Sequence, residues 1–247
     1  PAALRSAAAA AERGGAVPLS DVELLAPIPR PRQDVVCLGM NYRDHAEESA
    51  RYSADAFTKN STAAGYFSKR VSEAGKPDGV IPRHAGLTDR LDYEAELAVV
   101  LGKAARDVKA ADAADYIFGY TVLNDVSARD LQTGHKQWYF GKSLDGFTPM
   151  GPVLVTADEI AYPPALEITS RVNGELRQKS NTALLITSIG QILEELTGGM
   201  TLLPGTIIAT GTPAGVGMGF DPPRFLQSGD TVECAIEGIG TLCSTVI

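Results

Sequence analysis

Glycine and proline divide this chain into short segments along its whole length. The sequence contains 25 glycines and 15 prolines among 247 residues, and turns concentrate at these two residue types. Between the turns lie short apolar runs of strand length. These runs predict strands at residues 34–39, 94–101, 117–123, 153–156, 166–172, 206–210 and 231–236. Because the strands do not alternate regularly with helices, we expect a strand-rich α+β domain and not a doubly wound sheet.

Fewer segments have the character of helices. Residues 108–116 and 182–197 predict two helices, and the second ends at the stop signal Gly198-Gly199. Residues 44–52 predict a helical turn or two. Residues 53–65 are small and polar without a clear period, so we expect a mobile loop there.

The N-terminal region is expected to form an appendage of its own. Residues 1–15 are rich in alanine and predict a short helix that stops at Gly14-Gly15. The proline-rich segment 26–32 predicts extended chain. We therefore expect a short N-terminal appendage, residues 1–32, followed by one main domain, residues 33–247.

The charge balance narrows the classes of ligand. Lys plus Arg is 22 and Asp plus Glu is 30, a formal net charge of -8. An acidic chain repels polyphosphate, so nucleic acid is not an expected partner. An anionic substrate would need a local cation to reverse this field, either a metal ion or clustered Arg and Lys.

Targeting and cysteine signals favour a cytoplasmic protein. No run approaches the roughly 18 apolar residues of a membrane span, and the N-terminal segment lacks the apolar centre of a signal peptide. The three cysteines, Cys37, Cys234 and Cys243, show no zinc-site spacing. So sparse a set favours a reducing compartment and small buried side chains over disulfides.

Two glutamates separated by one residue lead into an apolar run. In a strand, Glu94 and Glu96 point to the same face, followed there by Ala98 and Val100. Carboxylates side by side on a buried face repel and lose hydration, and a bound cation relieves both costs. Carboxylate oxygens suit Mg²⁺, Mn²⁺ or Ca²⁺ better than zinc. The alternative is a solvated edge strand with alternating charges.

A third carboxylate, Asp125, stands where the apolar run 120–123 gives way to a turn. Functional residues are common at such positions, so Asp125 is a candidate third ligand. The alternative is that Asp125 caps a helix starting at Val126. We interpret Asp92 and Asp130 as solvated acids, or as acids that lie behind the ligands.

A histidine and a glutamate three residues apart form a candidate catalytic pair. If residues 44–50 are helical, His45 and Glu48 can touch. A carboxylate that binds one imidazole nitrogen leaves the other as a base near neutral pH, able to activate a water. The alternative is a surface helix with an incidental histidine.

Two glycine-bounded segments add candidate ligand contacts. Lys142 lies in a turn between Gly141 and Gly146, where backbone can approach a ligand. Residues 210–217, TGTPAGVG, follow a strand and offer hydroxyls and backbone N–H groups to a carboxylate. This segment lacks the lysine spacing of a P-loop, so nucleotide binding is disfavoured. The alternative for both segments is a tight turn without a ligand.

Taken in order, these motifs resemble the fumarylacetoacetate hydrolase family. Each motif is short, but five of them in one order argue against chance similarity. The resemblance covers residues 34–247. The motifs are Gly39-x-Asn41-Tyr42-x-x-His45, Tyr93-Glu94-x-Glu96-Leu97, Asn124-Asp125-x-x-Ala128-Arg129-Asp130-x-Gln132, Gly141-Lys142-Ser143 and Thr210-Gly211-Thr212-Pro213-x-Gly215-Val216-Gly217.

The resemblance implies a mixed β-sheet roll or sandwich with a few helices, a catalytic domain over residues 33–247, and assembly as a homodimer. It implies that Mg²⁺ or Mn²⁺ is bound by Glu94, Glu96 and Asp125. His45 and Glu48 would form a dyad on a segment that closes over the substrate. Further residues would contact substrate or stabilise developing negative charge: Lys69, Arg129, Gln132, Lys142, Thr210 and Gly211. Lys136 is a weaker candidate for the role of Lys142.

Two features depart from the family pattern or lack a family role. The N-terminal appendage is short, and residues 51–65 are long and polar, a stretch that could set substrate choice. Aromatic side chains are candidates for the wall around the substrate tail, although aromatics are more often core than pocket. These are Tyr66, Trp138, Tyr139, Phe140 and Phe147.

On this resemblance the first hypothesis is a metal-dependent hydrolase that cleaves a C–C bond in an acylpyruvate such as fumarylpyruvate or acetylpyruvate. The carboxylate and 2-oxo group would be held at the metal and residues 44–65 would close as a lid. The His45–Glu48 dyad would activate one water, and Lys142 would stabilise the departing pyruvate enolate.

The same site would serve other reactions of a small 2-oxo acid. Loss of CO₂ would make the protein an oxaloacetate decarboxylase, and enolisation with reprotonation would make it an isomerase of the 2-hydroxyhepta-2,4-diene-1,7-dioate type. A different class of hypothesis is a non-catalytic metabolite-binding or regulatory protein on this fold. A structural protein without a metal is a third.

Overall fold

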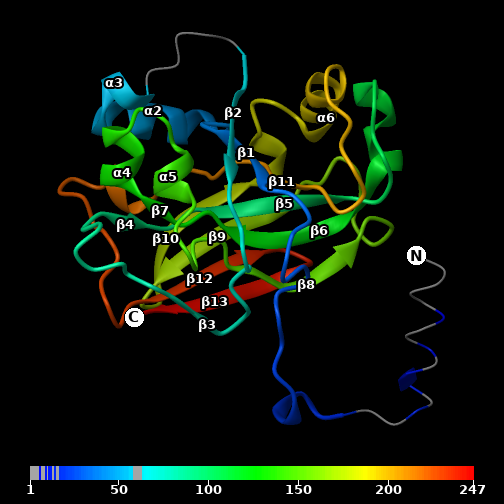
Figure 1. The fold of residues 1–247 in the computed structure, drawn as a ribbon, viewed down its shortest axis with the longest axis horizontal. Helices are drawn as coiled ribbons and strands as arrows, with labels where there is room; N and C mark the ends of the chain where they lie inside the picture. The colour runs from blue at the N-terminus through cyan, green and yellow to red at the C-terminus, as the bar shows by residue number, and fades with distance from the viewer. Residues whose placement is uncertain (1–5, 7–8, 10, 13, 15–16, 58–62) are drawn as a thin grey trace.

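Two β-sheets pack against each other and enclose most of the apolar core (Figure 1). A computed structural model describes residues 6, 9, 11, 12, 14, 17–57 and 63–247. One sheet has six strands in the order β2-β1-β11-β5-β6-β8, and the other has five in the order β10-β9-β12-β13-β3. Most neighbours are antiparallel, but β1 pairs with β11 and β13 pairs with β3 in parallel. The predicted mixed-sheet α+β fold is therefore confirmed.

The strand bounds follow the sheet order. The six-stranded sheet contains β2 (Gly65–Lys69), β1 (Val35–Gly39), β11 (Ile207–Ala209), β5 (Ala95–Leu101), β6 (Ile117–Asn124) and β8 (Met150–Thr156). The five-stranded sheet contains β10 (Glu175–Asn181), β9 (Glu167–Val172), β12 (Thr231–Ile236), β13 (Gly240–Val246) and β3 (Gly79–Ile81). A separate pair joins β4 (Leu91–Asp92) and β7 (Ser127–Ala128).

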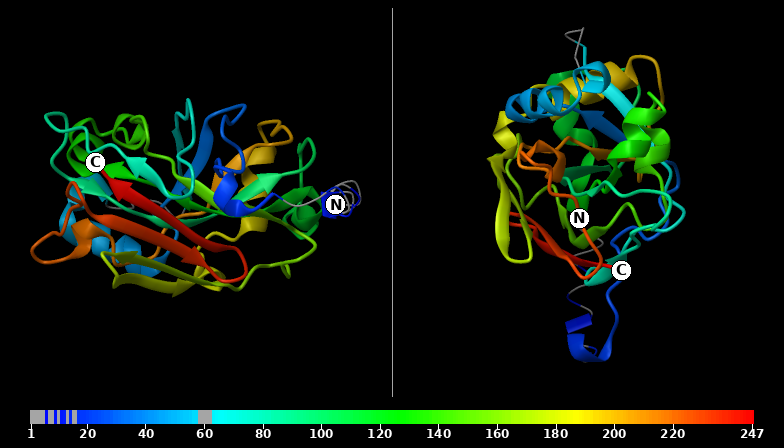
Figure 2. Two further views of the ribbon diagram at one scale, coloured as in Figure 1. Left: turned by 90° about the horizontal axis from the view of Figure 1, so that it is seen from below. Right: turned by 90° about the vertical axis from the view of Figure 1, so that its left-hand side faces the viewer.

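Short helices flank the six-stranded sheet (Figures 1 and 2), and the apolar side of α6 joins the core on the face that also meets the five-stranded sheet. The α-helices are α2 (Arg43–Tyr52), α3 (Ala54–Phe57), α4 (Arg129–Gly134), α5 (Tyr139–Lys142) and α6 (Ile189–Thr197). The 3₁₀ helices are η1 (Leu19–Asp21), η2 (Ala110–Tyr116), η3 (Thr182–Leu184) and η4 (Gly217–Gly219). Within the described part of the chain, no helix combines the length and the apolar character needed to cross a bilayer.

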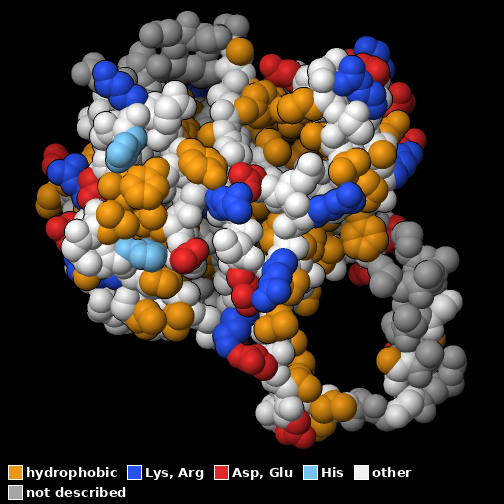
Figure 3. Space-filling model, viewed as in Figure 1, with side chains coloured by type: hydrophobic (Ala, Val, Ile, Leu, Met, Phe, Trp, Pro, Cys, Tyr) orange, Lys and Arg blue, Asp and Glu red, His pale blue; other side chains and the backbone are white. Residues whose placement is uncertain are grey.

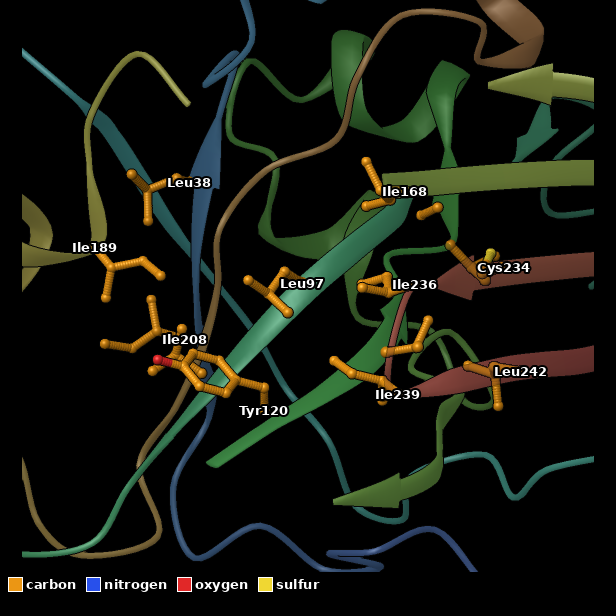
Figure 4. Packing of buried hydrophobic residues seen from close by; sticks show 14 of the residues in the cluster. Leu38, Leu97, Tyr120, Ile168, Ile189, Ile208, Cys234, Ile236, Ile239 and Leu242 are labelled. Atoms are coloured by element: carbon orange, nitrogen blue, oxygen red, sulfur yellow. The ribbon is translucent and has the colours of Figure 1, made fainter. Parts of the chain in front are cut away.

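Strand β5 is buried on both faces, and each face packs in a different apolar cluster. Its residues Leu97, Val99 and Leu101 belong to the core between the two sheets, where Figure 4 shows Leu97 between Ile208 of the same sheet and Ile236 of the other. The intervening residues Ala98 and Val100 belong to a second cluster on the opposite face. Side chains alternate along a strand, so Glu96 shares the face of Ala98 and Val100, as predicted.

Several helices and strands of the structure have bounds that differ from the predicted ones. The predicted helix 182–197 is two pieces, because Leu185 bridges to Tyr42 and Ser188 then caps α6 with a capping box to Gln191. Residues 110–116 form a 3₁₀ helix. β8 begins at Met150, three residues before the predicted strand. Strands β10 and β13 were not predicted, because polar residues interrupt their apolar pattern.

The predicted loop over residues 53–65 is partly regular structure. Residues Ala54–Phe57 form α3 and Gly65 begins β2, whereas residues 58–62 lie outside the described part of the chain. The predicted N-terminal helix also falls largely on positions that the structure does not describe. Beyond it, part of the described chain before β1 extends away from the body of the domain (Figure 3). Val17, Leu19 and Leu25 in this segment are exposed.

Candidate active site

Three buried carboxylates meet at the end of the central strand pair. Glu94 precedes β5, Glu96 lies in it, and Asp125 follows β6, whose Asn124 pairs with Ala95. One oxygen from each carboxylate lies within 4.8 Å of the others. Asp125 does not cap a helix, because β7 follows it and α4 begins only at Arg129. The structure thus brings the three predicted ligands together.

Two buried lysines neutralise part of this cluster. The Lys142 ammonium lies 2.8 Å from Glu94 Oε2 and 2.8 Å from Asp125 Oδ2. The Lys69 ammonium binds Asp125 Oδ1 and the carbonyl oxygen of Val126. Lys142 comes from α5 and Lys69 from the end of β2, so two segments far apart in sequence supply the cations. Lys136, the weaker candidate, is exposed.

The carboxylates differ in their electrostatic surroundings. Burial raises the pKa of Glu94, but the charges of Lys142 and Arg129 outweigh it and hold that pKa far below its usual range. Burial and the charges of Asp125 and Glu94 raise the pKa of Glu96 well above its usual value. None of the ion pairs within the described residues includes Glu96, whose Oε2 accepts only the Gly211 N–H, at 2.8 Å.

This donor set fits a hard divalent cation. All three groups offer carboxylate oxygens, which Mg²⁺ and Mn²⁺ prefer and zinc does not require. A divalent charge beside Glu96 would also offset the burial and repulsion that raise its pKa. Glu94, Glu96 and Asp125 are therefore the residues that could hold Mg²⁺ or Mn²⁺.

The predicted histidine–glutamate pair forms at the start of α2. His45 Nδ1 lies 3.1 Å from Glu48 Oε2, and both side chains are buried. The other ring nitrogen, Nε2, lies 3.4 Å from the Ser49 hydroxyl. Glu48 Oε1 accepts the N–H of Gly215 at 3.0 Å. The carboxylate is thus held from two sides and can fix the orientation of the imidazole.

The loop after β11, residues 210–219, holds three carboxylates through backbone N–H groups. Gly211 donates to Glu96 and Gly215 to Glu48. Gly217 and Met218 donate to the two oxygens of Asp92, at 2.6 and 2.9 Å. The sequence predicted a loop that binds a substrate carboxylate, but these N–H groups bind carboxylates of the protein itself.

The two threonines of this loop run beside β5. Thr210 donates both its N–H and its hydroxyl to the carbonyl oxygen of Leu97, and the Thr212 hydroxyl donates to that of Ala95. Gly211, between them, has a φ of +99°, in the left-handed region that favours glycine. Its N–H consequently reaches Glu96 while its neighbours face the strand.

Arg129 links the carboxylate cluster to Asp92. Its Nε lies 2.9 Å from Asp92 Oδ2 and its Nη1 lies 2.6 Å from Glu94 Oε1 and 3.1 Å from Gln132 Oε1. Its Nη2 is buried and has no hydrogen-bond partner within the described structure. Asp92 is fully buried, so of its two interpretations the structure agrees with an acid that lies behind the ligands and not with a solvated acid. Asp130 accepts a hydrogen bond from Thr88.

The polar groups face a narrow cavity of about 10 Å³, which is space for about one water. His45, Glu94, Arg129, Gln132 and Lys142 line one part of it. The rest of the wall is apolar apart from Ser49 and Thr212, and Thr212 lines the cavity where the sequence had favoured Thr210. The remaining lining residues are Leu38, Gly39, Met40, Ser49, Phe57, Phe67, Trp138, Thr212 and Met218.

An aromatic cluster closes this cavity. The Trp138 ring packs 5.6 Å from that of Phe57 and 5.2 Å from that of Phe67. A side chain at Gly39 would overlap the Trp138 ring, so this glycine lets the ring lie against β1. Phe57, on α3, joins Val216 and Met218 in a small apolar cluster. Helices α2 and α3 are thereby fixed over the carboxylates.

Several predicted contacts lie elsewhere. The Lys69 ammonium and the Thr210 hydroxyl bind protein groups and do not line the cavity, and Gly211 reaches Glu96 through its backbone. Of the five aromatics proposed for a tail pocket, Trp138 alone lines the cavity. Tyr66 donates to Glu195, Phe147 is core, and Tyr139 and Phe140 are partly exposed.

The chain is similar to known proteins over most of its length. The family model described as fumarylacetoacetate (FAA) hydrolase C-terminal matches residues 34–247. Oxaloacetate tautomerase YisK of Bacillus subtilis is 48% identical over 234 residues, covering 92% of this chain and 74% of that protein.

Solved structures show the same likeness. The fumarylacetoacetate hydrolase of psychrophilic Exiguobacterium antarcticum is 46% identical with a TM-score of 0.80, over 90% of this chain and 77% of that one. The 2-hydroxyhepta-2,4-diene-1,7-dioate isomerase of Mycobacterium marinum is 39% identical with a TM-score of 0.75, over 95% of this chain and 81% of that one.

Proposed function

The chain belongs to the fumarylacetoacetate hydrolase family, and from this premise we propose that it is a divalent-metal-dependent enzyme that interconverts the keto and enol forms of a small 2-oxo acid such as oxaloacetate. The observation that carries the proposal is that His45, oriented by Glu48, lines the same cavity as Glu94, Arg129 and Lys142. A base and several cations thus face one small space beside a candidate metal site.

The relatives support proton transfer more than any other reaction. One is named as an oxaloacetate tautomerase and another as an isomerase, and both names denote movement of a proton next to a carbonyl. Such a reaction needs a base, stabilisation of the enolate oxygen and exclusion of bulk water. The cavity offers all three.

Glu94, Glu96 and Asp125 would hold Mg²⁺ or Mn²⁺, which when bound supplies a Lewis acid that polarises a 2-oxo group and stabilises its enolate. His45 Nε2 then accepts a proton from C3 of the substrate. The same nitrogen returns that proton to the oxygen on C2, so no proton is gained or lost over the cycle. Glu48 holds the other ring nitrogen and stabilises the charged imidazolium.

The cations of the chain compensate the substrate's negative charge. Burial lowers the pKa of Lys142, but Asp125 and Glu94 outweigh it, so the pKa is raised and the ammonium stays charged. Lys142 can therefore donate to the enolate oxygen. Arg129 Nη2, which has no hydrogen-bond partner among the described residues, can donate to a substrate carboxylate. Phe57, Trp138 and Met218 keep bulk water out.

Acylpyruvate hydrolysis, the first hypothesis from the sequence, is the second candidate. The observation that favours it is the space for about one water beside His45. Activated by the dyad, that water would attack the distal carbonyl carbon. The C–C bond would then break, giving a carboxylic acid and the enolate of pyruvate, which takes up the proton held by His45.

One experiment separates these reactions. Chelator-stripped protein is refilled with Mg²⁺ and given enol-oxaloacetate, whose decay is followed by ultraviolet absorbance, and acetylpyruvate, which is followed by proton NMR. Decay of the enol faster than with Mg²⁺ alone supports the tautomerase. Acetate and pyruvate from acetylpyruvate would shift the assignment to hydrolysis, and pyruvate from oxaloacetate to decarboxylation.

A matched pair of histidine variants links activity to the site. His45→Ala should abolish enol decay above the Mg²⁺ background, whereas His135→Ala, which changes an exposed histidine on the outer surface, should leave it unchanged. No turnover of either substrate by the wild-type protein, or full activity in His45→Ala, would overturn the proposal.

A further inference from the structure

A fully buried glutamine of the five-stranded sheet reaches across to the candidate metal site. Gln178 lies in β10 and has no exposed surface. The pairing of β10 with β9 shifts register between Leu176 and Gln178. Bulges of this kind re-aim side chains and are frequent next to active sites. Here the side chain of Gln178 points to the six-stranded sheet and not to solvent.

Three hydrogen bonds close a ring around this side chain. Gln178 Oε1 accepts the N–H of Ala95 at 3.1 Å, and Gln178 Nε2 donates to the Thr212 hydroxyl at 2.8 Å. The Thr212 hydroxyl donates in turn to the carbonyl oxygen of Ala95, at 2.9 Å. Nε2 also donates to the carbonyl oxygen of Pro213, at 2.7 Å. A single amide thus joins β10, β5 and the loop after β11.

The ring encloses the backbone between two candidate metal ligands. Ala95 separates Glu94 from Glu96. Hydrogen bonds to the N–H and C=O of Ala95 therefore hold the backbone from which both carboxylate side chains extend. Thr212 follows Gly211, whose N–H binds Glu96. The position of Glu96 relative to the Gly211 N–H is therefore set by the two residues that Gln178 holds.

At Gly215 the loop lies directly against the backbone of β10. Gly215 has a φ of +103°, and a Cβ there would overlap the carbonyl oxygen of Arg177. The Tyr93 hydroxyl also donates to the carbonyl oxygen of Gly215, at 2.9 Å. Close packing of this kind transmits a change in Gln178 to the loop instead of absorbing it.

We propose that Gln178 is a positioning residue for the metal centre: by fixing the distance between Ala95 and Thr212, it sets the spacing of the carboxylate ligands and hence the divalent-metal affinity. The inference rests on the proposed metal-dependent function. Gln178 belongs neither to the carboxylate cluster nor to the cavity lining, and it acts through Ala95 and Thr212. Partners behind metal ligands typically change metal affinity about 10–100-fold when they are removed.

The test uses Gln178→Met, which keeps the length of the side chain and removes all of its hydrogen bonds. Binding of Mn²⁺ alone to chelator-stripped protein is measured by electron paramagnetic resonance, and thermal unfolding is measured in chelator. We expect Mn²⁺ affinity to fall about tenfold or more, with turnover recovering in large part at saturating Mn²⁺.

The matched control is Thr121→Val. Thr121 is also fully buried in the six-stranded sheet, and its hydroxyl donates to the carbonyl oxygen of Val153 at 2.7 Å. This variant also removes a hydrogen bond from a buried side chain to the backbone, but one on β6 away from the ring. It should lower the unfolding temperature and leave Mn²⁺ affinity within about twofold of wild type.

The outcomes distinguish this proposal from the proposed function. Wild-type binding of Mn²⁺ with unchanged affinity in Gln178→Met, or equal losses of affinity in both variants, would overturn the role of Gln178 alone. No Mn²⁺ binding by the wild-type protein would overturn the metal site as well. If Gln178→Met does not fold, Thr212→Val opens the same ring at another corner, and unchanged Mn²⁺ affinity there would overturn the inference.

Discussion

Glu48 lies directly against Gly219, and the contact leaves no room for a side chain at that glycine. A Cβ at position 219 would overlap the Glu48 carboxylate, which binds His45. Gly219→Ala should therefore displace Glu48 and lower kcat at least about tenfold, since general base catalysis contributes about 10²–10⁴. Steady-state kinetics at saturating Mg²⁺ measures this. Gly199→Ala, at a glycine with open space around it, should keep the wild-type kcat, and equal losses would contradict the argument.

Substitution of Lys142 should lower turnover without weakening metal binding. Its ammonium contacts two candidate ligands, Glu94 and Asp125, so it competes electrostatically with a bound cation. Lys142→Gln is expected to leave Mn²⁺ affinity unchanged or increased, and to lower kcat about 10²-fold or more because the enolate loses a charged donor. Calorimetric titration with Mn²⁺ and enol decay give the two quantities. Lys136→Gln, at an exposed lysine, is the control, and weaker Mn²⁺ binding in Lys142→Gln would contradict the prediction.

Asp92 should matter for stability as well as activity. It is the buried partner of Arg129 Nε and the acceptor for the N–H groups of Gly217 and Met218. Asp92→Asn removes the charge with little change of shape, and breaking one side of a buried ion pair costs roughly 3–5 kcal/mol. Urea unfolding should show a loss of that order. Asp89→Asn, in an exposed pair with Arg83, should change stability by less than about 1 kcal/mol.

Metal binding should strengthen as the pH rises. The folded-state pKa of Glu96 is raised, so the protonated carboxyl is favoured at low pH and this contribution is lost as the pH rises through that pKa. A metal ion must displace the proton. The rise in unfolding temperature on adding Mg²⁺ should therefore grow as the pH increases above the usual carboxyl range and level off above the folded-state pKa of Glu96. Glu96→Gln should flatten the profile, and a wild-type profile independent of pH would contradict the prediction.

The alternation of apolar and polar residues predicted the central strands better than the outer strands and the helices. Strand β5 and the shared face of Glu96, Ala98 and Val100 follow from period-two alternation, which burial enforces. Strands β10 and β13 were not predicted because they carry polar residues, which lie along a sheet edge or face solvent. The single helix expected over 182–197 is broken by a bridge between Leu185 and Tyr42, a long-range pairing that no local window contains.

The candidate site was predictable where residue type carries the chemistry. The cluster of Glu94, Glu96 and Asp125, and the contact of His45 with Glu48, followed from spacing and strand ends. Gln178 was not singled out, and the two interpretations of Asp92 stayed open, because an isolated Asp or Gln has no spacing signal and its partners lie elsewhere in the chain. The motif order anticipated the family, but it could not tell substrate contacts from contacts within the protein.

The loop over residues 210–219 has a consequence for how the site tolerates substitution. Its bonds to Glu96, Glu48 and Asp92 come from peptide N–H groups, which every residue except proline possesses. The residue types of this loop therefore determine the course of the backbone and do not supply reactive side chains. In a saturation mutagenesis screen, Gly211, Gly215 and Gly219 would be as intolerant as acid–base residues, although none of them has a side chain to contribute.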